Sequence, residues 1–536
     1  MRTRIFLALA ALLALCAFTA SRFPVFWVPF GLLVGLGLLG VADVTQRRRA
    51  VLRNFPVIGH FRYLLEAIRP EINQYFIESN TDGTPFNREL RSVVYQRAKG
   101  VLDTVPFGTQ EDVYAEGYEW VSHSILARDL HGQEAPRVRI GGPRCSAPYE
   151  AALLNVSAMS YGSLSANAVL AMGHGAREAG CFHNTGEGGI SPYHLRAGAD
   201  LVWQLGTGYF GCRRSDGGFD PEAFARQAGR PEVRMVEVKL SQGAKPGHGG
   251  ILPARKVTRE IAEIRGVPLG KDVHSPPAHS AFHTPRELCE WVDRLRELSG
   301  GKPIGIKLCV GDATEVLALG KAMLATGGGP DFITVDGGEG GTGAAPLEFA
   351  NSVGMPLREG LVLVHNMLVG FGLRERVRVI ASGRVVTGFD VAVRIALGAD
   401  LVSSARAMMM AVGCIQARRC NSNDCPVGVA TQIPGLVQGL DVEDKSRRVA
   451  SFQRETVEGF MELLGAAGLE RPEQLGPERI LRRTSAREVA SLAEVFPFIE
   501  PNSLLVDPVP EHLEGAWRRA SADSFAPVEP EAACGS

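Results

Sequence analysis

The sequence lacks a surplus of charge of either sign. Its 536 residues include 57 Lys and Arg against 58 Asp and Glu, so the formal net charge is −1. Proteins that bind nucleic acid usually carry a basic patch or stripe that attracts phosphates over a distance. The charge balance therefore argues against nucleic acid as a partner and leaves a small neutral or acidic ligand open.

A disulfide framework and a dinucleotide motif are also missing. The ten cysteines are scattered, except for a close group at Cys414, Cys420 and Cys425. This pattern does not fit a secreted disulfide-bonded domain and indicates a reducing compartment with a metal site. No G-x-G-x-x-G follows a predicted strand and opens a predicted helix. We therefore expect any nicotinamide cofactor on another protein.

Glycine, by contrast, is abundant. The chain has 62 glycines, above the roughly 7% of average usage. They occur in clusters and not in one low-complexity tract. Because glycine has no side chain, such clusters bring the backbone close to a ligand, and they predict phosphate-binding turns.

The amino terminus contains two apolar runs, residues 5–20 and 23–42, and the second matches the ~20 residues that a spanning helix needs. Arginines flank both outer ends of the pair: Arg2, Arg4, Arg47, Arg48, Arg49 and Arg53. Positive charge marks the inner side, so the pattern predicts a transmembrane hairpin over 1–45 in the inner (cytoplasmic) membrane, with the catalytic domain in the cytoplasm. Alternatively, residues 1–20 are a cleaved signal peptide, although their end is a poor cleavage site.

Residues 46–145 are mixed and charged, with helical patterns at Phe61–Ile68 and Arg88–Lys99. They predict a mixed helical adaptor without catalytic residues. Residues 441–536 predict a helical extension at the carboxyl end.

Between them, from 146 to 440, apolar β-branched runs alternate with helical stretches. The predicted strands are 152–158, 180–184, 233–239, 272–275, 304–309, 332–336, 377–382 and 400–404. The predicted helices include Ala166–Ala179, Thr284–Leu298, Ala313–Ala325, Arg358–Gly370 and Gly388–Leu397. This alternation is typical of an α/β protein with a parallel sheet, and eight strands favour a (β/α)8 TIM barrel. A doubly wound sheet is the alternative.

Active sites of such barrels lie at the carboxyl ends of the strands. Polar residues and glycines gather there: Ser157–Gly162, Asn184–Gly189, Lys239, His274–Pro277, Lys307, Asp336–Gly343 and Ser382–Arg384. A purely structural core does not need so many polar groups at one rim. The pattern therefore predicts the functional site.

Two of these ends suggest a phosphate. Gly337–Gly343 follows the sixth predicted strand and Ser382–Arg384 the seventh, where many barrels bind phosphate. In glycine-rich turns, successive backbone N–H groups can donate hydrogen bonds to one anion, and an arginine can add two charge-assisted hydrogen bonds. Tight turns without a ligand are the alternative. Lys307 lies near the end of the fifth predicted strand. There its positive charge could stabilise the negative edge of a reduced flavin. Alternatively, its side chain extends to solvent.

Glu187 and Lys245 lie in glycine-rich loops after two other predicted strands. Either side chain could orient a dicarboxylate or its amine partner.

The three close cysteines fit an iron-sulfur cluster, because thiolates are its ordinary ligands. A zinc site usually takes a fourth Cys or His, and none lies within this segment. Unrelated buried thiols are the alternative.

With these residues the chain resembles the FMN-binding synthase domain of glutamate synthase, and within it the shorter membrane-associated FMN-binding glutamate synthase family proteins. The resemblance runs from Pro148 to Gln432. It rests on SAMSYGSLS, NTGEGG, KLSQGAKPGHGG, SPPAHS, GGTGAAP and C-x5-C-x4-C-PVGVATQ.

The resemblance implies a barrel that binds FMN and a 3Fe-4S cluster held by Cys414, Cys420 and Cys425. Residues at the flavin and its phosphate would be Ser157, Met159, Ser160, Lys307, Gly341, Thr342, Gly343, Gly383 and Arg384. Glu187, Lys245 and Arg265 would surround 2-oxoglutarate, and a guanidinium such as that of Arg265 can grip a carboxylate with two hydrogen bonds.

The implied activity is that of an oxidoreductase acting on CH–NH2 donors. Electrons from ferredoxin or a separate NAD(P)H-oxidising protein would pass through the cluster to FMN, and then to the imine formed from 2-oxoglutarate and ammonia or a similar amine. The cofactor carries this chemistry, while the protein supplies position and charge.

The chain departs from the family at several points. His248 and Ile251 stand where the family usually has Glu and Gln, and that Gln is a presumed substrate contact. We expect neither the amino-terminal glutaminase of full-length glutamate synthases nor their carboxyl-terminal β-helix here, so the protein should not release ammonia from glutamine by itself. Two alternatives therefore remain: an FMN and iron-sulfur oxidoreductase for a different 2-oxo acid or amine, and a membrane-bound redox relay without a substrate.

Overall fold

The computed structural model describes residues 2–102 and 104–529. Cys534, at the end of the predicted carboxyl-terminal extension, lies outside the described residues. Contacts divide the chain into two units, 1–88 and 89–536. The predicted boundaries at 45, 145 and 440 stay predictions.

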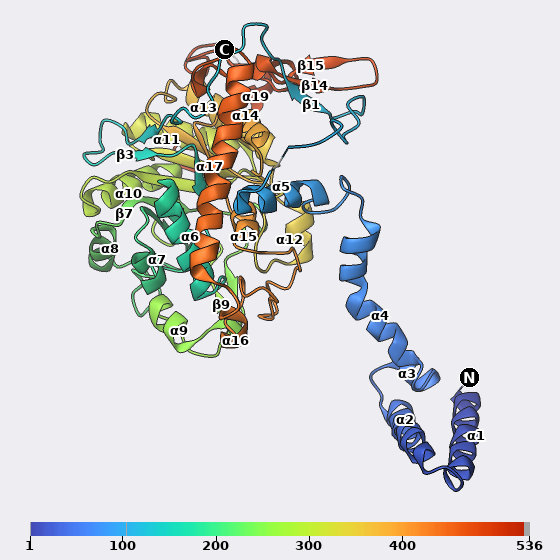
Figure 1. Cartoon of the computed structure of the whole chain (residues 1–536). Helices are drawn as coiled ribbons and strands as arrows, with labels where there is room; N and C mark the ends of the chain where they lie inside the picture. Colours follow the sequence, from blue (N-terminus) through green and yellow to red (C-terminus); the bar gives the residue numbers. More distant parts are fainter. Residues whose placement is uncertain (1, 103, 530–536) are drawn as a thin grey trace. The chain divides into compact units, whose positions relative to one another are not determined.

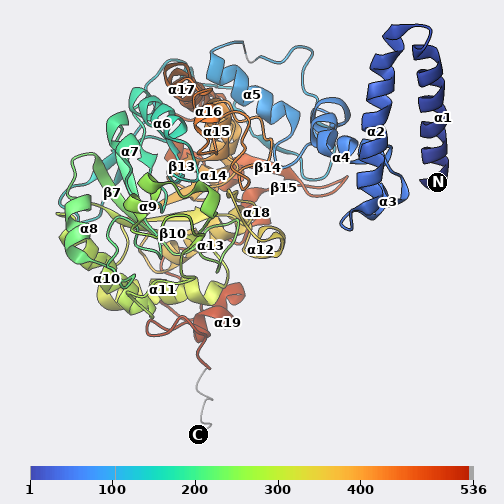
Figure 2. The same ribbon diagram turned by 90° about the horizontal axis from the view of Figure 1, so that it is seen from below.

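The first unit is helical (Figure 1). Its helices are α1 (Arg2–Ala20), the 3-10 turn η1 (Pro24–Phe26), α2 (Trp27–Thr45), α3 (Ala50–Asn54), α4 (Gly59–Ile72) and the π-helical turn η2 (Asn73–Ile77). The segments Arg2–Ala20 and Pro24–Thr45 are long and apolar enough to cross a membrane, and they pack side by side as a hairpin (Figure 2). A signal sequence can meet the same criteria of length and composition.

The second unit is built on a closed barrel of eight parallel strands. In order around the barrel, they are β4 (Leu154–Val156), β5 (His183–Asn184), β6 (Leu201–Leu205), β7 (Val233–Lys239), β10 (Ile304–Cys309), β11 (Phe332–Asp336), β12 (Arg378–Ser382) and β13 (Leu401–Ser404). Because β7 pairs with β10 and β13 with β4, the ring is complete. The predicted (β/α)8 barrel is confirmed, and the doubly wound alternative is wrong.

One of the eight predicted strands is wrong and one barrel strand was missed, so the predicted number of strands is still eight. The predicted strand 272–275 lies outside the barrel, where β9 (Val273–His274) pairs antiparallel with β8 (Ile251–Leu252). The third barrel strand is instead β6, which the sequence analysis overlooked. All five β6 residues are buried, so the strand has no alternation of exposed and buried side chains. Only the six-residue helix α7 (Pro192–Ala197) precedes it, which weakened the helical signal between strands.

Helices cover the outside of the barrel (Figure 1). They include α6 (Ala166–Ala179), α8 (Pro221–Ala228), α10 (Pro285–Leu298), α11 (Ala313–Thr326), α13 (Leu357–Gly370), α14 (Gly388–Ala396) and α15 (Arg406–Ala411). The helix α9 (Arg259–Arg265) lies instead beside the loop after β4, where Arg265 contacts Ser160 and Tyr161. Local sequence sets their ends. For example, the side chain of Ser165 accepts a hydrogen bond from the amide of Ala168 at the start of α6, and Gly180 ends the helix in the left-handed conformation.

Further elements surround the barrel. They are α5 (Arg88–Lys99), β1 (Glu119–Val121), β2 (Val138–Ile140), β3 (Tyr149–Ala151), the 3-10 turn η3 (Ala254–Lys256), α12 (Leu347–Ser352), α16 (Pro434–Val437), α17 (Val442–Ala466), β14 (Ile480–Arg483), β15 (Val489–Ser491), α18 (Leu492–Val495) and α19 (Glu511–Arg519). The long helix α17 packs along α6 and α14 (Figure 1). The carboxyl-terminal extension is helical only in part, because β14 pairs with both β15 and the distant β1.

The β2–β3 hairpin plugs the amino-terminal end of the barrel. Its side chains Ile140 and Tyr149 join a buried apolar cluster with the early residues of several strands, such as Phe182, Met235 and Phe332. This end is therefore a packed core, and the polar residues are left to the opposite rim.

Gly305 in β10 gives a test of this packing. A Cβ atom at position 305 would overlap the buried ring of Phe332, whereas a Cβ at the neighbouring Gly311 would meet open space. We expect Gly305→Ala to lower the free energy of unfolding by about 1–3 kcal/mol. The control Gly311→Ala should stay within about 0.5 kcal/mol of the wild type. Denaturant unfolding followed by tryptophan fluorescence measures both, and equal effects would show that the barrel interior tolerates the added methyl group.

Candidate active site

The carboxyl ends of adjacent barrel strands bring several predicted residues into one layer. Lys239 of β7 is level with Lys307 of β10, and Asp336 of β11 is level with Ser382 of β12. The hydroxyl groups of Ser382 and Ser157 lie 3.0 Å apart, although the two residues are 225 positions apart in the chain. The predicted strand ends thus meet at one rim.

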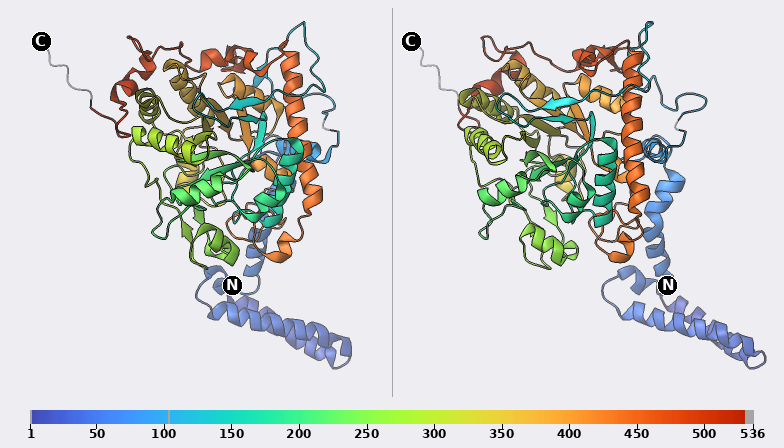
Figure 3. Two further views of the ribbon diagram at one scale, coloured as in Figure 1. Left: turned by 90° about the vertical axis from the view of Figure 1, so that its left-hand side faces the viewer. Right: turned by 60° about the vertical axis from the view of Figure 1, so that its left-hand side comes forward.

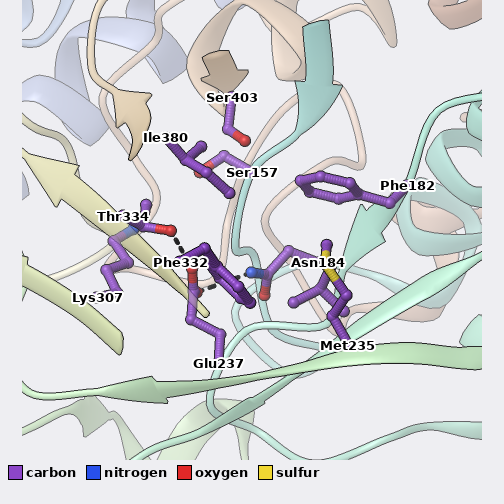
Figure 4. Close-up of a pocket in the computed structure, with 11 residues that line it drawn as sticks. Ser157, Phe182, Asn184, Met235, Glu237, Lys307, Phe332, Thr334, Ile380 and Ser403 are labelled. Carbon is purple, nitrogen blue, oxygen red and sulfur yellow. Dashed lines mark hydrogen bonds between the residues drawn. The ribbon is translucent and has the colours of Figure 1, made fainter. Parts of the chain in front are cut away.

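Below this rim lies a cavity inside the barrel (Figure 4). Its polar wall includes Glu237, which the sequence analysis did not single out. Glu237 is buried, and its carboxylate accepts hydrogen bonds from Asn184, Gln204 and Thr334 at 2.6–2.8 Å. The negative charge is therefore held in place by three neutral donors.

Lys307 also lines this cavity, and the residue is only 6% exposed. Extension to solvent is therefore wrong for this lysine. Its Nζ lies 3.5 Å from Oδ2 of Asp336. Burial disfavours the charged amine, but the carboxylates of Asp336 and Glu237 outweigh it and raise the pKa of Lys307. The rim thus holds a buried ammonium group.

The two glycine-rich turns lie next to each other. A Cβ built on Gly383 would lie 3.9 Å from the amide nitrogen of Gly337. The side chain of Arg406 also contacts the first of these turns. It donates a hydrogen bond to the carbonyl of Glu339 at 2.8 Å, and a Cβ built on Gly341 would lie 2.8 Å from Cδ of Arg406. Thr342 is exposed, and the space around Gly343 is open.

Arg406 begins α15 directly after the last barrel strand, and the sequence analysis overlooked it. Burial lowers the pKa of Arg406, and the nearby positive charge of Arg384 lowers it further, while Asp336 opposes the shift. Two guanidinium groups therefore stand close together beside bare glycine turns. An anion such as a phosphate would offset their repulsion. The position after strands seven and eight could have indicated this residue.

A second charged cluster surrounds Glu187. Lys239 donates from Nζ to Oε1 of Glu187 at 2.9 Å and to Gln242 at 2.6 Å. Burial disfavours the ionised carboxylate, but the positive charges of Lys239, Arg265 and Lys245 outweigh it and lower the pKa of Glu187. The carboxylate is therefore ionised. Lys239, recognised from the sequence only as a strand end, is the residue that positions it.

Lys245 is almost fully buried and donates from Nζ to the carbonyl of Ala344, at 2.8 Å, in the loop after β11. Burial lowers its pKa to about 8, although the charge of Glu187 works in the opposite direction. This hydrogen bond joins the predicted substrate loop to the predicted phosphate loop.

Arg265 ends α9 and is 5% exposed. One of its terminal nitrogens donates to the carbonyl of Tyr161 at 3.1 Å and lies 3.4 Å from the hydroxyl of Ser160. Its Nε has no hydrogen-bond partner among the described residues. Burial lowers its pKa to about 10, against the pull of Glu187. A buried donor without a partner is costly, and a carboxylate ligand would satisfy it. Met159 is buried just before Ser160 in this loop.

The three close cysteines follow α15 and are not in disulfides. Burial raises the pKa of Cys414 to about 12, and the charges of Cys420 and Cys425 contribute, so the three thiols lie near one another. Among the described residues, the group of potential ligand atoms within 4.8 Å of one another is His131, Glu458 and Glu462, and does not include these thiols. The iron-sulfur cluster therefore stays a prediction from the spacing of the three cysteines in the sequence.

Lys256 links this cysteine segment to the rim, and the sequence analysis did not single it out. Its Nζ is buried and donates to the carbonyl of Ser163 at 3.0 Å and to that of Ala430 at 2.8 Å. Burial lowers its pKa to about 8, against the charges of Cys420 and Cys425. One buried ammonium group therefore holds the loop after β4 and the segment after the cysteines together.

Known proteins match this chain over the barrel and beyond. A family model described as a conserved region in glutamate synthase matches residues 140–470. The glutamate synthase large subunit-like protein YerD of Bacillus subtilis is 38% identical over 483 residues, which cover 83% of this chain and 91% of that protein. The archaeal glutamate synthase (NADPH) of Methanocaldococcus jannaschii is 38% identical over 326 residues, or 60% of each chain.

Solved structures are more distant. A mandelate oxidase variant aligns with 80% of this chain at 17% identity and a TM-score of 0.40. A likeness at this level carries no argument about function.

The buried Lys245 predicts a pH dependence of stability. Its pKa is lowered from 10.5 to about 8 on folding, so between these values the unfolded chain binds more protons than the folded one. The free energy of unfolding of the wild type, measured relative to Lys245→Met, should therefore rise by up to about 3 kcal/mol as the pH increases from 8 to 10.5. Denaturant titrations at several pH values measure it.

The exposed Lys99→Met in α5 is the matched control and should show no such rise. A difference between the wild type and Lys245→Met that stays constant with pH would contradict the burial of a neutralisable lysine at this position.

Proposed function

The chain belongs to the glutamate synthase family, and on this basis we propose that it reductively aminates 2-oxoglutarate to glutamate with FMN and a 3Fe-4S cluster. The observation that carries the proposal is the meeting of two charged clusters at one barrel rim. Arg384 and Arg406 stand beside bare glycine turns, and Lys239, Lys245 and Arg265 surround an ionised Glu187. The first suits a phosphate and the second a dicarboxylate.

The residues at the rim fit FMN. The glycine turns with Arg384 and Arg406 would hold the phosphate, which offsets the repulsion between the two guanidinium groups. Ser157, Met159 and Ser160 would border the flavin, and the buried ammonium of Lys307 would face its ring. When bound, FMN supplies the hydride that reduces an imine. The residues themselves position the ring and stabilise negative charge on it.

The cysteine segment fits a three-iron cluster. Cys414, Cys420 and Cys425 are near enough to interact electrostatically and are not disulfide-bonded. Burial raises the pKa of Cys414 and of Cys420, and iron would supply the positive charge that stabilises their thiolates. When bound, the cluster passes single electrons. Lys256 holds the segment against the loop that carries Ser157, Met159 and Ser160.

The second charged cluster would bind the substrate. Lys245 and Arg265 would grip the two carboxylates of 2-oxoglutarate, and the free Nε of Arg265 offers one of the required donors. The ionised Glu187 would hold the positively charged nitrogen, which comes from ammonia or a similar amine. Lys239 fixes the orientation of Glu187 and is a positioning residue.

The remaining parts of the proposal concern the membrane and the electron donor. The hairpin α1–α2 would anchor the chain in the inner membrane, with the barrel in the cytoplasm. Electrons would come from ferredoxin or a separate NAD(P)H-oxidising protein.

A second candidate is the same chemistry on a different 2-oxo acid or amine. The loop with His248 and Ile251 runs past the proposed substrate residues, because a Cβ on Gly250 would contact the carboxylate of Glu187. The ring of His248 packs against that of Phe349 at 5.1 Å, and Ile251 pairs with His274 in the β8–β9 sheet. A redox relay without a substrate would leave the buried cations around Glu187 without a role.

The activity is tested with full-length protein purified anaerobically in detergent. With a chemical reductant, we expect it to form glutamate from 2-oxoglutarate and ammonia. Arg265→Met should raise KM for 2-oxoglutarate by about 10²-fold, because a buried charged partner of the substrate is lost. Arg259→Met, at an exposed position of the same helix, should leave KM unchanged. Faster turnover of another 2-oxo acid and amine would favour the second candidate, and a flavin that no 2-oxo acid reoxidises would favour the relay.

The cluster is tested separately by iron analysis and paramagnetic resonance. We expect Cys425→Ser to lose both the iron and the three-iron signal while it keeps the flavin absorbance, since the flavin and the cluster are held by different residues. The buried Cys181→Ala should keep the iron, the signal and the flavin. Full iron content in Cys425→Ser would exclude this thiol as a ligand.

A further inference from the structure

The helix α4 of the first unit has an apolar stripe that remains largely exposed. Phe61, Leu64, Leu65 and Ile68 follow the i, i+3, i+4, i+7 spacing of one helix face, and each is 40–65% exposed. The flank of the helix carries an ion pair in which Nε of Arg62 lies 2.9 Å from Glu66. Such an exposed apolar stripe on a charged helix marks an interaction surface.

The start of α4 is fixed to the end of the apolar hairpin. Asp43, in the last turn of α2, is buried and accepts a hydrogen bond from the amide of Val57 at 2.8 Å. The same carboxylate lies 2.8 Å from Nε2 of His60 in the first turn of α4. The stripe therefore begins where the hairpin would leave the membrane.

The direction of α4 also fits a position on a membrane surface. Within the first unit, α4 runs across the direction of the α1–α2 hairpin and not along it (Figures 2 and 3). A hairpin that spans the bilayer would thus leave α4 close to the membrane plane. Beyond α4, the turn η2 exposes three more large apolar side chains: Tyr75, Phe76 and Ile77.

The charges between the hairpin and α4 favour anionic lipid. Arg47, Arg48, Arg49 and Arg53 lie in the short connection between α2 and α4. Basic residues next to a membrane span are attracted to the anionic cytoplasmic leaflet, by about 1 kcal/mol each. A helix with an apolar stripe and charged flanks beside such a cluster has the features of an interfacial helix.

We propose that α4 lies on the cytoplasmic surface of the membrane, with Phe61, Leu64, Leu65 and Ile68 inserted among the lipids and the arginines at anionic headgroups. This inference rests on the membrane anchoring included in the proposed function. It adds a lipid-binding surface that extends beyond the spanning hairpin and makes the contact of the chain with the membrane sensitive to lipid charge.

The test uses full-length protein in vesicles of phosphatidylcholine with phosphatidylglycerol. The photo-crosslinking residue p-benzoylphenylalanine replaces Leu65 in the stripe, Glu66 on the flank, or Leu32, an exposed residue of α2. Mass spectrometry then counts lipid adducts after illumination, with flavin absorbance as the measure of folding. We expect at least about fivefold more lipid adduct at position 65 than at position 66, and fewer adducts at 65 when phosphatidylglycerol is left out.

The three positions distinguish the surface position of α4 from the membrane anchoring of the hairpin. Adducts at position 32 but equally few at 65 and 66, or adducts between position 65 and protein, would overturn the surface position of α4 while the anchor stands. An absence of lipid adducts at position 32 would overturn the anchor and this inference together.

Discussion

Closure of the eight-stranded barrel is the constraint on which the candidate site depends. In a closed parallel sheet every strand end of one kind lies on the same rim, whatever the distance between the strands in the chain. Ser157 and Ser382 are neighbours for this reason, as are Lys239 and Lys307. The β2–β3 hairpin and the apolar side chains around Phe332 fill the opposite end. The barrel thus has one packed end and one polar end.

The polar end holds more buried charge than stability alone would favour. Taking an ion out of water is costly, and in this site burial lowers the pKa of Lys245 to about 8 and that of Arg265 to about 10. Ion pairing offsets part of this cost at Lys307 and Glu187, where neighbouring opposite charges outweigh burial. At Arg265, Nε has no hydrogen-bond partner among the described residues. Buried cations of this kind are expected in a site that binds an anionic cofactor and an anionic substrate.

Lysines also connect the parts of the site. Lys245 joins the loop after β7 to the loop after β11, and Lys256 joins the loop after β4 to the cysteine segment. Each forms its links through backbone carbonyls, so the link depends on the backbone path of the partner loop and not on its side chains. The proposed flavin, substrate and cluster regions are therefore coupled through two buried ammonium groups.

The sequence by itself determined the barrel, seven of its eight strands and the apolar hairpin, and it predicted most residues of the candidate site, because hydrophobic periodicity and strand-end motifs are local signals. It also identified the cysteine segment by its spacing. Periodicity could not separate β6 from a buried loop, because all five of its residues are buried. It also could not exclude β9, because the pairing of β9 with β8 outside the barrel is set by the tertiary structure. Only the tertiary structure decided that Arg406 stands beside Arg384, that Lys239 holds Glu187 and that Lys256 reaches the cysteine segment. These contacts depend on through-space distances between residues far apart in the chain, and no local pattern encodes such distances.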